Sequence, residues 1–259
     1  MLSISVMGLK GGVGKTSVTL GLAGAATLRG LATLVVDLDP QGNATSILAT
    51  RRPKATVSDV IANPTVEMLE TALTVCEWEV EPGEVDVLPS TSDVVQFDAY
   101  TPGKFRPRLA KALKFLDGYD LVLFDCPPSH GSLVREALSA SDAAVVVTTP
   151  SFFGGQGVDR AVATIKEVRR EHNPNLEFAG VIINRVRSTV EEHSYRQREI
   201  ANVHGRASIL TPVIPERVAM QQAESYGQPV QTISSAAGKE LREAFDKHLT
   251  RLLRTYAAE

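Results

Sequence analysis

Cysteine is scarce in this sequence, and its scarcity argues against two classes of protein. The 259 residues contain only Cys76 and Cys126. Two isolated thiols without an export signal favour a reducing cytoplasm and exclude a disulfide framework. Their spacing offers no pair of metal ligands, so an electron-transfer protein with a cluster at a subunit interface is disfavoured.

Long hydrophobic runs and a leader segment are also missing. No apolar run reaches about 18 residues, so we expect no membrane span. The N-terminus enters a predicted strand without a basic leader or cleavage site, so we expect no signal peptide. A chain with 43% hydrophobic and 22% charged residues is typical of a soluble globular protein. We therefore predict a single domain over residues 1–259 in the cytoplasm.

The sequence has no overall excess of positive charge. Its net charge of −3 argues against a broadly basic nucleic-acid-binding protein. The charges are nevertheless uneven, because residues 185–259 contain 11 Lys or Arg against 9 Asp or Glu. We therefore keep the hypothesis of a local basic face in the last third of the chain.

A glycine-rich segment, Gly8–Thr16, is the most informative stretch that the sequence does contain. It resembles the phosphate-loop pattern G-x-x-x-x-G-K-[ST], except that the first position falls on Leu9 and the glycine comes one residue early. The alternating run Leu2–Met7 predicts a strand before the loop, and Thr16–Arg29 predicts a helix after it. Backbone N–H groups at the start of such a helix form an anion site.

Two side chains of this loop are suited to nucleotide chemistry. We expect Lys15 to reach the β- and γ-phosphates of a nucleotide and the Thr16 hydroxyl to ligate Mg²⁺. The simpler alternative is a glycine-rich turn that is followed by Lys and Thr by chance. The neighbouring strand, the helix and a later acidic residue all favour the phosphate loop.

Two aspartates follow predicted strands and complete the expected site. Asp125 ends the hydrophobic strand Tyr119–Asp125, where an acid would hold Mg²⁺ through water. Asp39 follows the buried strand Leu31–Leu38, in a loop with proline and glycine that could bring it to the γ-phosphate. The alternatives are a helix-capping role for Asp125 and a turn-forming role for Asp39.

Predicted strands and helices alternate along the whole chain. This alternation predicts an α/β fold with a mostly parallel central sheet and helices on both of its faces. Among the local predictions are capping boxes at Thr56–Asp59 and Thr189–Glu192 and a helix over Lys104–Leu116. The terminal helix Gly238–Tyr256 carries an apolar stripe, which favours docking on the core over lying on a membrane.

Three motifs together resemble the ParA/Soj branch of the ParA/MinD family of deviant Walker ATPases. They are Lys10–Thr16, Asp37–Asn43 and Asp125–Pro128, in this order and spacing. Weaker similarities include Phe152-Phe153, Asn184-Arg185 and Ile214-Pro215, so the resemblance covers most of the chain. It implies a fold of the P-loop NTPase type, with ATP and Mg²⁺ as cofactors.

The resemblance also implies roles for individual residues. Lys10 would be the signature lysine, which reaches the nucleotide of a partner subunit, and Asp39 would place the attacking water. Asn184 would recognise adenine, and the segment around Pro215 would cover the base. The metal ligands that we expect are Thr16 and Asp125, and the catalytic residues are Lys10, Lys15 and Asp39. The residues that we expect to contact the nucleotide are Lys10, Gly11, Gly12, Val13, Gly14, Lys15, Thr16, Ser17, Asp125, Asn184 and Pro215.

The activity that the resemblance implies is an ATP-dependent switch. An ATP-bound homodimer would bind non-specific DNA on the nucleoid, and a ParB-like or adaptor protein would stimulate its slow hydrolysis. The cargo would be a chromosome or plasmid. Alternatives are positioning of a non-DNA cargo and membrane-associated positioning like that of MinD. Candidate DNA contacts are Arg196, Arg198, Arg206, Arg217, Lys239 and Arg242.

Overall fold

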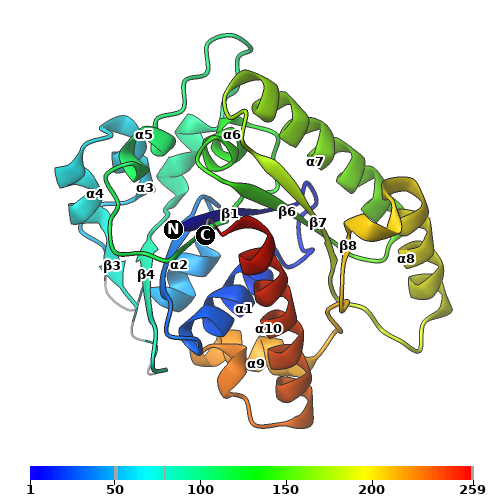
Figure 1. Cartoon of the computed structure of the whole chain (residues 1–259). Helices are drawn as coiled ribbons and strands as arrows, with labels where there is room; N and C mark the ends of the chain where they lie inside the picture. Colours follow the sequence, from blue (N-terminus) through cyan, green and yellow to red (C-terminus); the bar gives the residue numbers. More distant parts are fainter. Residues whose placement is uncertain (50–51, 77, 79, 258–259) are drawn as a thin grey trace.

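A single sheet organises the protein. The computed structural model describes residues 1–49, 52–76, 78 and 80–257. Within these residues, eight strands form one sheet in the order β3-β4-β2-β5-β1-β6-β7-β8. Every neighbouring pair is parallel except β3 and β4 at one edge. The predicted fold class, a mostly parallel sheet with helices on both faces, is confirmed (Figure 1).

The elements alternate along the chain as the hydrophobic patterns predict. The strands are β1 (Leu2–Met7), β2 (Ala32–Asp37), β3 (Thr74–Val75), β4 (Glu84–Leu88), β5 (Leu121–Asp125), β6 (Ala143–Thr148), β7 (Glu177–Ile183) and β8 (Ile209–Leu210). The α-helices are α1 (Lys15–Thr27), α2 (Asn43–Leu48), α3 (Val57–Ala62), α4 (Val66–Ala72), α5 (Leu109–Leu113), α6 (Ser132–Ser139), α7 (Phe152–Glu171), α8 (Glu191–His204), α9 (Val218–Tyr226) and α10 (Ala236–Tyr256). A 3₁₀ helix, η1 (Ser92–Phe97), follows β4.

The two faces of the sheet support two separate hydrophobic cores. Successive residues of a strand point to opposite faces, so Leu123 packs with α1 and α10 while Phe124 packs with α6 and α7. Helices α1, α2, α9 and α10 cover one face, and α3 to α8 cover the other (Figure 1). Strands that are buried on both faces explain the continuous apolar runs in the sequence.

The terminal helix α10 docks on α1. The predicted apolar stripe consists of Leu241, Phe245, Leu249, Leu252 and Tyr256, of which the first four are fully buried and Tyr256 is partly buried. A Cβ atom at Gly21 would overlap the ring of Phe245, so this glycine allows the two helices to approach closely. The stripe therefore serves packing rather than membrane contact. No helix in the described ranges is long and apolar enough to cross a bilayer.

Three local predictions can be compared with the structure. The capping box at the start of α3 is present, because Asp59 Oδ2 accepts the Thr56 N–H at 2.8 Å. The box predicted at Thr189 is wrong, since α8 begins at Glu191 after Val190. The helix predicted over Lys104–Leu116 is shortened at both ends to α5. Pro107 accounts for the N-terminal part, because it disfavours helical backbone at the residue before it.

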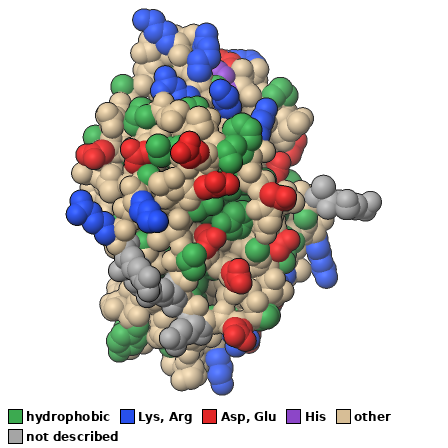
Figure 2. All heavy atoms as spheres, turned by 90° about the vertical axis from the view of Figure 1, so that its left-hand side faces the viewer, with side chains coloured by type: hydrophobic (Ala, Val, Ile, Leu, Met, Phe, Trp, Pro, Cys, Tyr) green, Lys and Arg blue, Asp and Glu red, His purple; other side chains and the backbone are tan. Residues whose placement is uncertain are grey.

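Charge is unevenly distributed over the surface. The side of the molecule that carries α3 and α4 presents mostly Asp and Glu side chains across its middle (Figure 2). Lys and Arg side chains gather instead at the top of the same view, where the loop before α5 projects in Figure 1. The loop thus concentrates positive charge on a protein whose net charge is −3.

Candidate functional site

The site forms where three neighbouring strands end. In the parallel register, Asp125 of β5 lies opposite Val6 of β1 on one side and Asp37 of β2 on the other. The loops that leave these strands therefore meet at one edge of the sheet. Ligands of open α/β sheets bind at this edge, outside the carboxyl ends of the strands.

The glycine-rich segment forms a tight loop between β1 and α1. Gly12 and Gly14 have φ angles of 75° and 87°, which favour glycine. A Cβ atom at Gly8 would overlap the carbonyl oxygen of Val147. The loop thus has a glycine where the chain packs against β6, and Leu9 occupies the position that the strict pattern assigns to glycine. Helix α1 begins directly after Gly14, so its first N–H groups face the loop.

The two lysines of the loop lie in different surroundings. The side chain of Lys15 is buried, with 6% of the residue exposed. Lys10 lies on the exposed outer part of the loop. A buried cation beside backbone N–H groups suits a phosphate inside the site, whereas Lys10 is exposed to solvent.

Thr16 and Asp125 form the pair of oxygen donors that the sequence predicts for a metal. The Thr16 hydroxyl donates to Asp125 Oδ2 at 2.6 Å, and the Thr19 hydroxyl lies 3.4 Å from Asp125 Oδ1. Burial, and then the negative charge of Asp37, raise the pKa of Asp125 to about 8. A cation beside this carboxylate would favour its charged form.

The donor set of this pair fits Mg²⁺. No cluster of three or more His, Cys, Asp or Glu side chains suited to a metal occurs in the described residues. Mg²⁺ does not need such a cluster, because it keeps several waters and binds through one or two protein oxygens together with phosphate oxygens. Thr16 and Asp125 supply oxygens of this kind beside the phosphate loop.

Asp37 is a buried residue of the site whose structural role the sequence analysis missed. Its carboxylate accepts the Asp39 N–H at 3.0 Å and both the N–H and the hydroxyl of Thr45 at 2.8 and 2.7 Å. Burial raises the pKa of Asp37 to about 6. These bonds fix the start of the loop that carries Asp39, which is 8% exposed and bonds to the Gln41 N–H at 2.9 Å. Only the spacing of the two aspartates hinted at this arrangement.

The residues expected around the base line one groove. Asn184 follows β7 and donates from Nδ2 to the Val13 carbonyl at 2.8 Å, which ties it to the phosphate loop. Pro215 pairs with Val186 in an isolated bridge beside it. The groove is lined by Ser17, Asn184, Arg185, Ile214, Pro215, Glu216, Arg217, Met220, Gln221 and Glu224.

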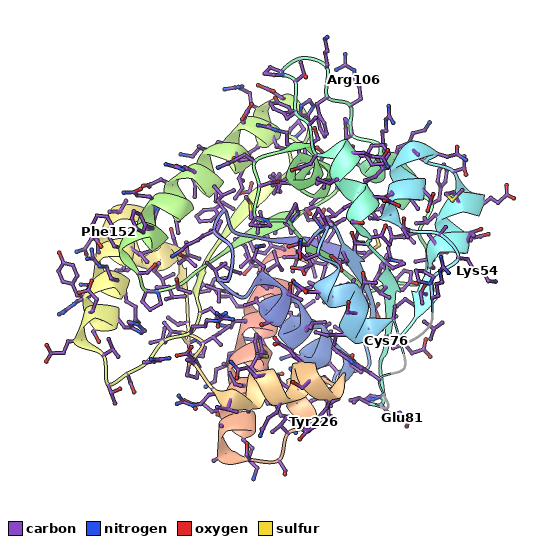
Figure 3. All side chains as sticks on the ribbon, turned by 180° about the vertical axis from the view of Figure 1, so that it is seen from behind. Lys54, Cys76, Glu81, Arg106, Phe152 and Tyr226 are labelled. Carbon is purple, nitrogen blue, oxygen red and sulfur yellow. The ribbon has the colours of Figure 1, made fainter. Side chains whose placement is uncertain are left out.

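Helix α9 closes the groove on the side of α1. Glu224 accepts a 2.5 Å hydrogen bond from the Ser17 hydroxyl. In the view from behind, α9 ends near the labelled Tyr226 and lies below α1 (Figure 3). No local sequence pattern indicates Glu224 as a residue of the site, because it lies 207 positions from Ser17.

The candidate DNA-contacting residues differ in whether they already form ion pairs with carboxylates of the protein. Arg196 forms ion pairs with Glu192 and Glu199 at 2.6 and 2.8 Å. Arg217 pairs with Glu240 at 2.8 Å. Arg198 and Arg206 line a hollow between α8 and β8, and Lys239 and Arg242 are exposed on α10. The structure does not gather all six arginines and lysines on one surface element.

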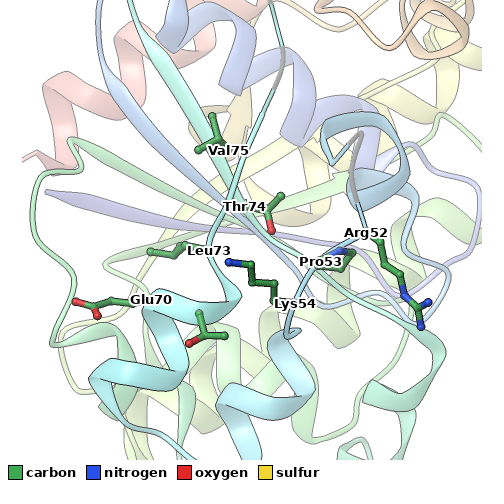
Figure 4. Close-up of a pocket in the computed structure, with 8 residues that line it drawn as sticks. Arg52, Pro53, Lys54, Glu70, Leu73, Thr74 and Val75 are labelled. Atoms are coloured by element: carbon green, nitrogen blue, oxygen red, sulfur yellow. The ribbon is translucent and has the colours of Figure 1, made fainter.

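A larger hollow lies away from this site. It has a volume of about 570 Å³ and is lined by residues of the segment before α3, of α4 and of β3, namely Arg52, Pro53, Lys54, Glu70, Thr71, Leu73, Thr74 and Val75 (Figure 4). Strands β4, β2 and β5 separate β3 from β1. At about 4.8 Å per strand, β3 lies roughly 19 Å from β1, and the hollow shares no lining residue with the nucleotide groove.

The site has the features of a P-loop protein. These features are a glycine-rich loop, a buried lysine and a threonine–aspartate pair, all at the carboxyl edge of a parallel sheet. Comparison with known proteins narrows this class. An AAA domain family model matches residues 1–178. The chain is 33% identical over 230 residues to the chromosome-partitioning ATPase Soj of Thermus thermophilus, covering 88% of this chain and 86% of Soj. It is 31% identical over 236 residues to the chromosome partitioning protein ParA of Caulobacter vibrioides, covering 88% and 85%.

Solved structures of nucleotide-binding proteins have a similar fold. Cobyrinic acid a,c-diamide synthase from Mycobacterium smegmatis, with a bound ATP analog and magnesium, superposes with a TM-score of 0.80 at 27% identity and covers 98% of this chain and 96% of its own. The chain belongs to the ParA/MinD family of P-loop ATPases, as the motifs in the sequence predicted. Both of the curated relatives described above are partition proteins by name.

Proposed function

We propose that this protein is an ATP-hydrolysing switch that dimerises on ATP, binds non-specific DNA and partitions a chromosome or plasmid with a ParB-type partner. The observation that carries the proposal is the contrast between its two loop lysines. Lys15 is buried at the start of α1, whereas Lys10 is exposed on the same loop. One loop therefore offers one cation to its own nucleotide and one to a nucleotide across an interface.

The residues of the site divide the binding of ATP and Mg²⁺ among them. The loop Lys10–Ser17 would hold the phosphates, and Asn184 and Pro215 would hold the base in the adjoining groove. Thr16 and Asp125 would hold Mg²⁺, which neutralises the charge that develops on the transferred phosphoryl group. Asp39, whose backbone N–H donates to the Asp37 carboxylate, would orient the attacking water. Residues 1–259 would act as one functional unit.

The nucleotide would control the assembly of the protein. Burial of two ATP molecules between subunits couples nucleotide binding to dimerisation, because a ligand stabilises the state that binds it better. Loss of the γ-phosphate removes the charge that holds the Asp39 and Asp125 loops, so these loops relax after hydrolysis. Weak intrinsic hydrolysis that a partner stimulates would then set the lifetime of the dimer.

DNA binding and nucleoid association would follow from the dimer. Lys and Arg contacts to phosphates need no sequence recognition and weaken steeply with salt. The names of the Soj and ParA relatives support a role in chromosome partitioning. Membrane-associated positioning is less well supported, because the apolar stripe of α10 is buried against the core. The main alternative is that the protein positions a cargo other than DNA, and an experiment must distinguish this alternative from DNA partitioning.

The test combines size-exclusion chromatography with DNA co-sedimentation in ATP, in ADP and without nucleotide, at two salt concentrations. We expect a dimer and DNA binding in ATP alone, with binding that falls at the higher salt. Dimerisation in ATP without any DNA binding would indicate a non-DNA cargo. ATP-dependent binding to vesicles without DNA binding would indicate the membrane alternative.

The variant Asp39→Ala tests the proposed chemistry. We expect ATP-dependent dimers with turnover reduced about a hundredfold or more, because the attacking water loses the group that orients it. Single-turnover hydrolysis by the purified dimer measures the effect. The matched control is Gln41→Ala, which changes the same loop beside Asp39 and should keep most of the turnover. Wild-type turnover in Asp39→Ala would refute the proposed role of this carboxylate.

A further inference from the structure

A strongly basic surface lies outside the site described so far. No acidic residue occurs between Asp98 and Asp117, and the interval contains five cations. We call residues 104–114 the basic segment. All five of its cations are exposed, and they are Lys104, Arg106, Arg108, Lys111 and Lys114.

Among the described residues, the cations of the basic segment are not engaged in close ion pairs, although the Arg108 charge does act on the buried Glu136 carboxylate. None of its five cations forms an ion pair with a carboxylate in the described part of the chain. Arg106 donates to the carbonyls of Gly103 and Phe105 at 3.0 and 2.8 Å, so it keeps its charge at the surface. The arginines Arg196 and Arg217 differ, since each already pairs with glutamate.

The backbone of the basic segment is held firmly while its cations point outward. The ring of Phe105 is buried and lies edge-on to His172, with 5.0 Å between ring centroids. Glu136 of α6 is buried and accepts the N–H groups of Arg108 and Leu109 at 2.9 and 2.8 Å. Figure 3 shows the labelled Arg106 on the projecting loop. An ordered basic surface loses less conformational entropy on binding than a mobile one.

The stretch before the basic segment is tied to the loop that follows Asp125. Asp98 Oδ1 accepts bonds from the Ser129 hydroxyl at 3.3 Å and from the Leu133 N–H at 3.2 Å. The Asp98 carbonyl accepts the Ser132 N–H at 3.0 Å. A Cβ atom at Gly131 would overlap Asp98, so the two stretches are in close contact. A movement of the Asp125 loop would therefore act on the stretch that precedes the basic segment.

We propose that the basic segment is a contact surface for the DNA backbone and that Asp98 couples its position to the Asp125 loop. The inference rests on the proposed function, because it assumes that the ATP-bound protein binds DNA. It adds a surface that does not include any of the six arginines and lysines named from the sequence.

The composition of the segment favours DNA over an acidic protein partner. Between Lys104 and Lys114 every exposed side chain is a cation, while Phe105, Leu109, Ala112 and Leu113 are buried. Phosphate contacts need charge and no apolar pocket, since they carry no sequence information. The core of a protein–protein interface is instead depleted of charge and rich in apolar anchors.

The experiment measures binding of labelled mixed-sequence duplex DNA by fluorescence anisotropy, in ATP and in ADP, over a range of salt concentrations. The test protein carries Lys104→Gln, Arg106→Gln and Arg108→Gln. The matched control carries Lys54→Gln, Lys166→Gln and Lys247→Gln, which remove the same charge from three exposed positions elsewhere. ATP binding and the unfolding transition of all three proteins verify that the site and fold persist.

We expect the test protein to lose at least about tenfold in DNA affinity in ATP and the control to lose less than about threefold. The slope of log affinity against log salt should fall by about 3 in the test protein, at about 0.9 per phosphate contact. Equal losses in both proteins would overturn the proposal. Undiminished DNA binding with lost stimulation by a partner would also overturn it and assign the segment to an acidic protein.

The proposed function and the proposed DNA-contact surface can be refuted separately. If the wild-type protein binds no DNA in ATP, the proposed function fails and this surface fails with it. If the wild-type protein binds DNA and the test protein binds equally well, the proposal fails alone. The variant Asp98→Ala tests the coupling, and we expect it to reduce the ratio of DNA affinities in ATP and ADP. An unchanged ratio would show that Asp98 transmits nothing.

Discussion

The first turn of α1 and its later turns serve different purposes within one helix. In the first turn, the side chains of Thr16 and Ser17 reach across to Asp125 and Glu224. In the later turns, Gly21 and Gly24 have no room for a Cβ atom, because Phe245 and Gln231 lie directly against them. The beginning of the helix is thus polar and specific, whereas the remainder is closely packed.

This difference indicates how function and stability are separated. A hydroxyl that bonds to a carboxylate can exchange that partner for a metal or a phosphate, so the first turn is able to change with its ligand. The later turns cannot change in the same way, since protein interiors are packed at crystal-like density. Substitutions in the first turn should therefore change binding, and substitutions in the later turns should change folding.

The largest effect is expected from Lys15→Ala in the first turn. The buried ammonium is the cation that the loop offers to its own nucleotide, so its loss should reduce ATP affinity on the order of a thousandfold or more. Isothermal titration calorimetry measures the affinity. The control is Lys10→Ala, which should keep monomer binding while impairing the dimer or hydrolysis. Normal ATP binding by Lys15→Ala would refute the phosphate-loop assignment.

The next largest effect is expected from Phe245→Ala, which empties the space against Gly21. Removal of a fully buried phenyl ring should lower the free energy of unfolding by about 4 kcal/mol. Urea denaturation measures this loss. Leu253→Ala, a partly buried position on the same helix, should cost less than half as much. If Phe245→Ala instead weakened ATP binding in the still-folded protein, the separation between the two parts of α1 would not hold.

The sequence predicted the fold and the strand-end motifs well, because both depend on local patterns. Continuous apolar runs marked the buried strands, and the glycine-rich loop marked the start of α1. The sequence did not reveal partners that only tertiary structure brings together. Glu224 meets Ser17 across 207 positions, and Asp98 reaches the Asp125 loop. Pro107 also shortened a predicted helix, which periodicity alone could not show.

The smallest expected effect is on the pH dependence of the free energy of unfolding, and it arises from His248 of α10. This histidine is fully buried on α10, the helix that docks on α1, and burial lowers its pKa to about 4. The unfolded chain, with a histidine pKa near 6.5, therefore binds more protons than the folded protein between these values. The free energy of unfolding should fall by up to about 3 kcal/mol as the pH drops from about 6.5 to about 4.

Urea denaturation of wild type and His248→Gln over this pH range would isolate the contribution. We expect the variant to have a flatter dependence of unfolding free energy on pH, because its side chain does not take up a proton. His193→Gln on α8 is the control, since it removes a histidine from a half-exposed position and leaves the buried one in place. If wild type and His248→Gln gave parallel curves, the acid sensitivity would have to arise elsewhere, and the buried histidine of α10 would not be its origin.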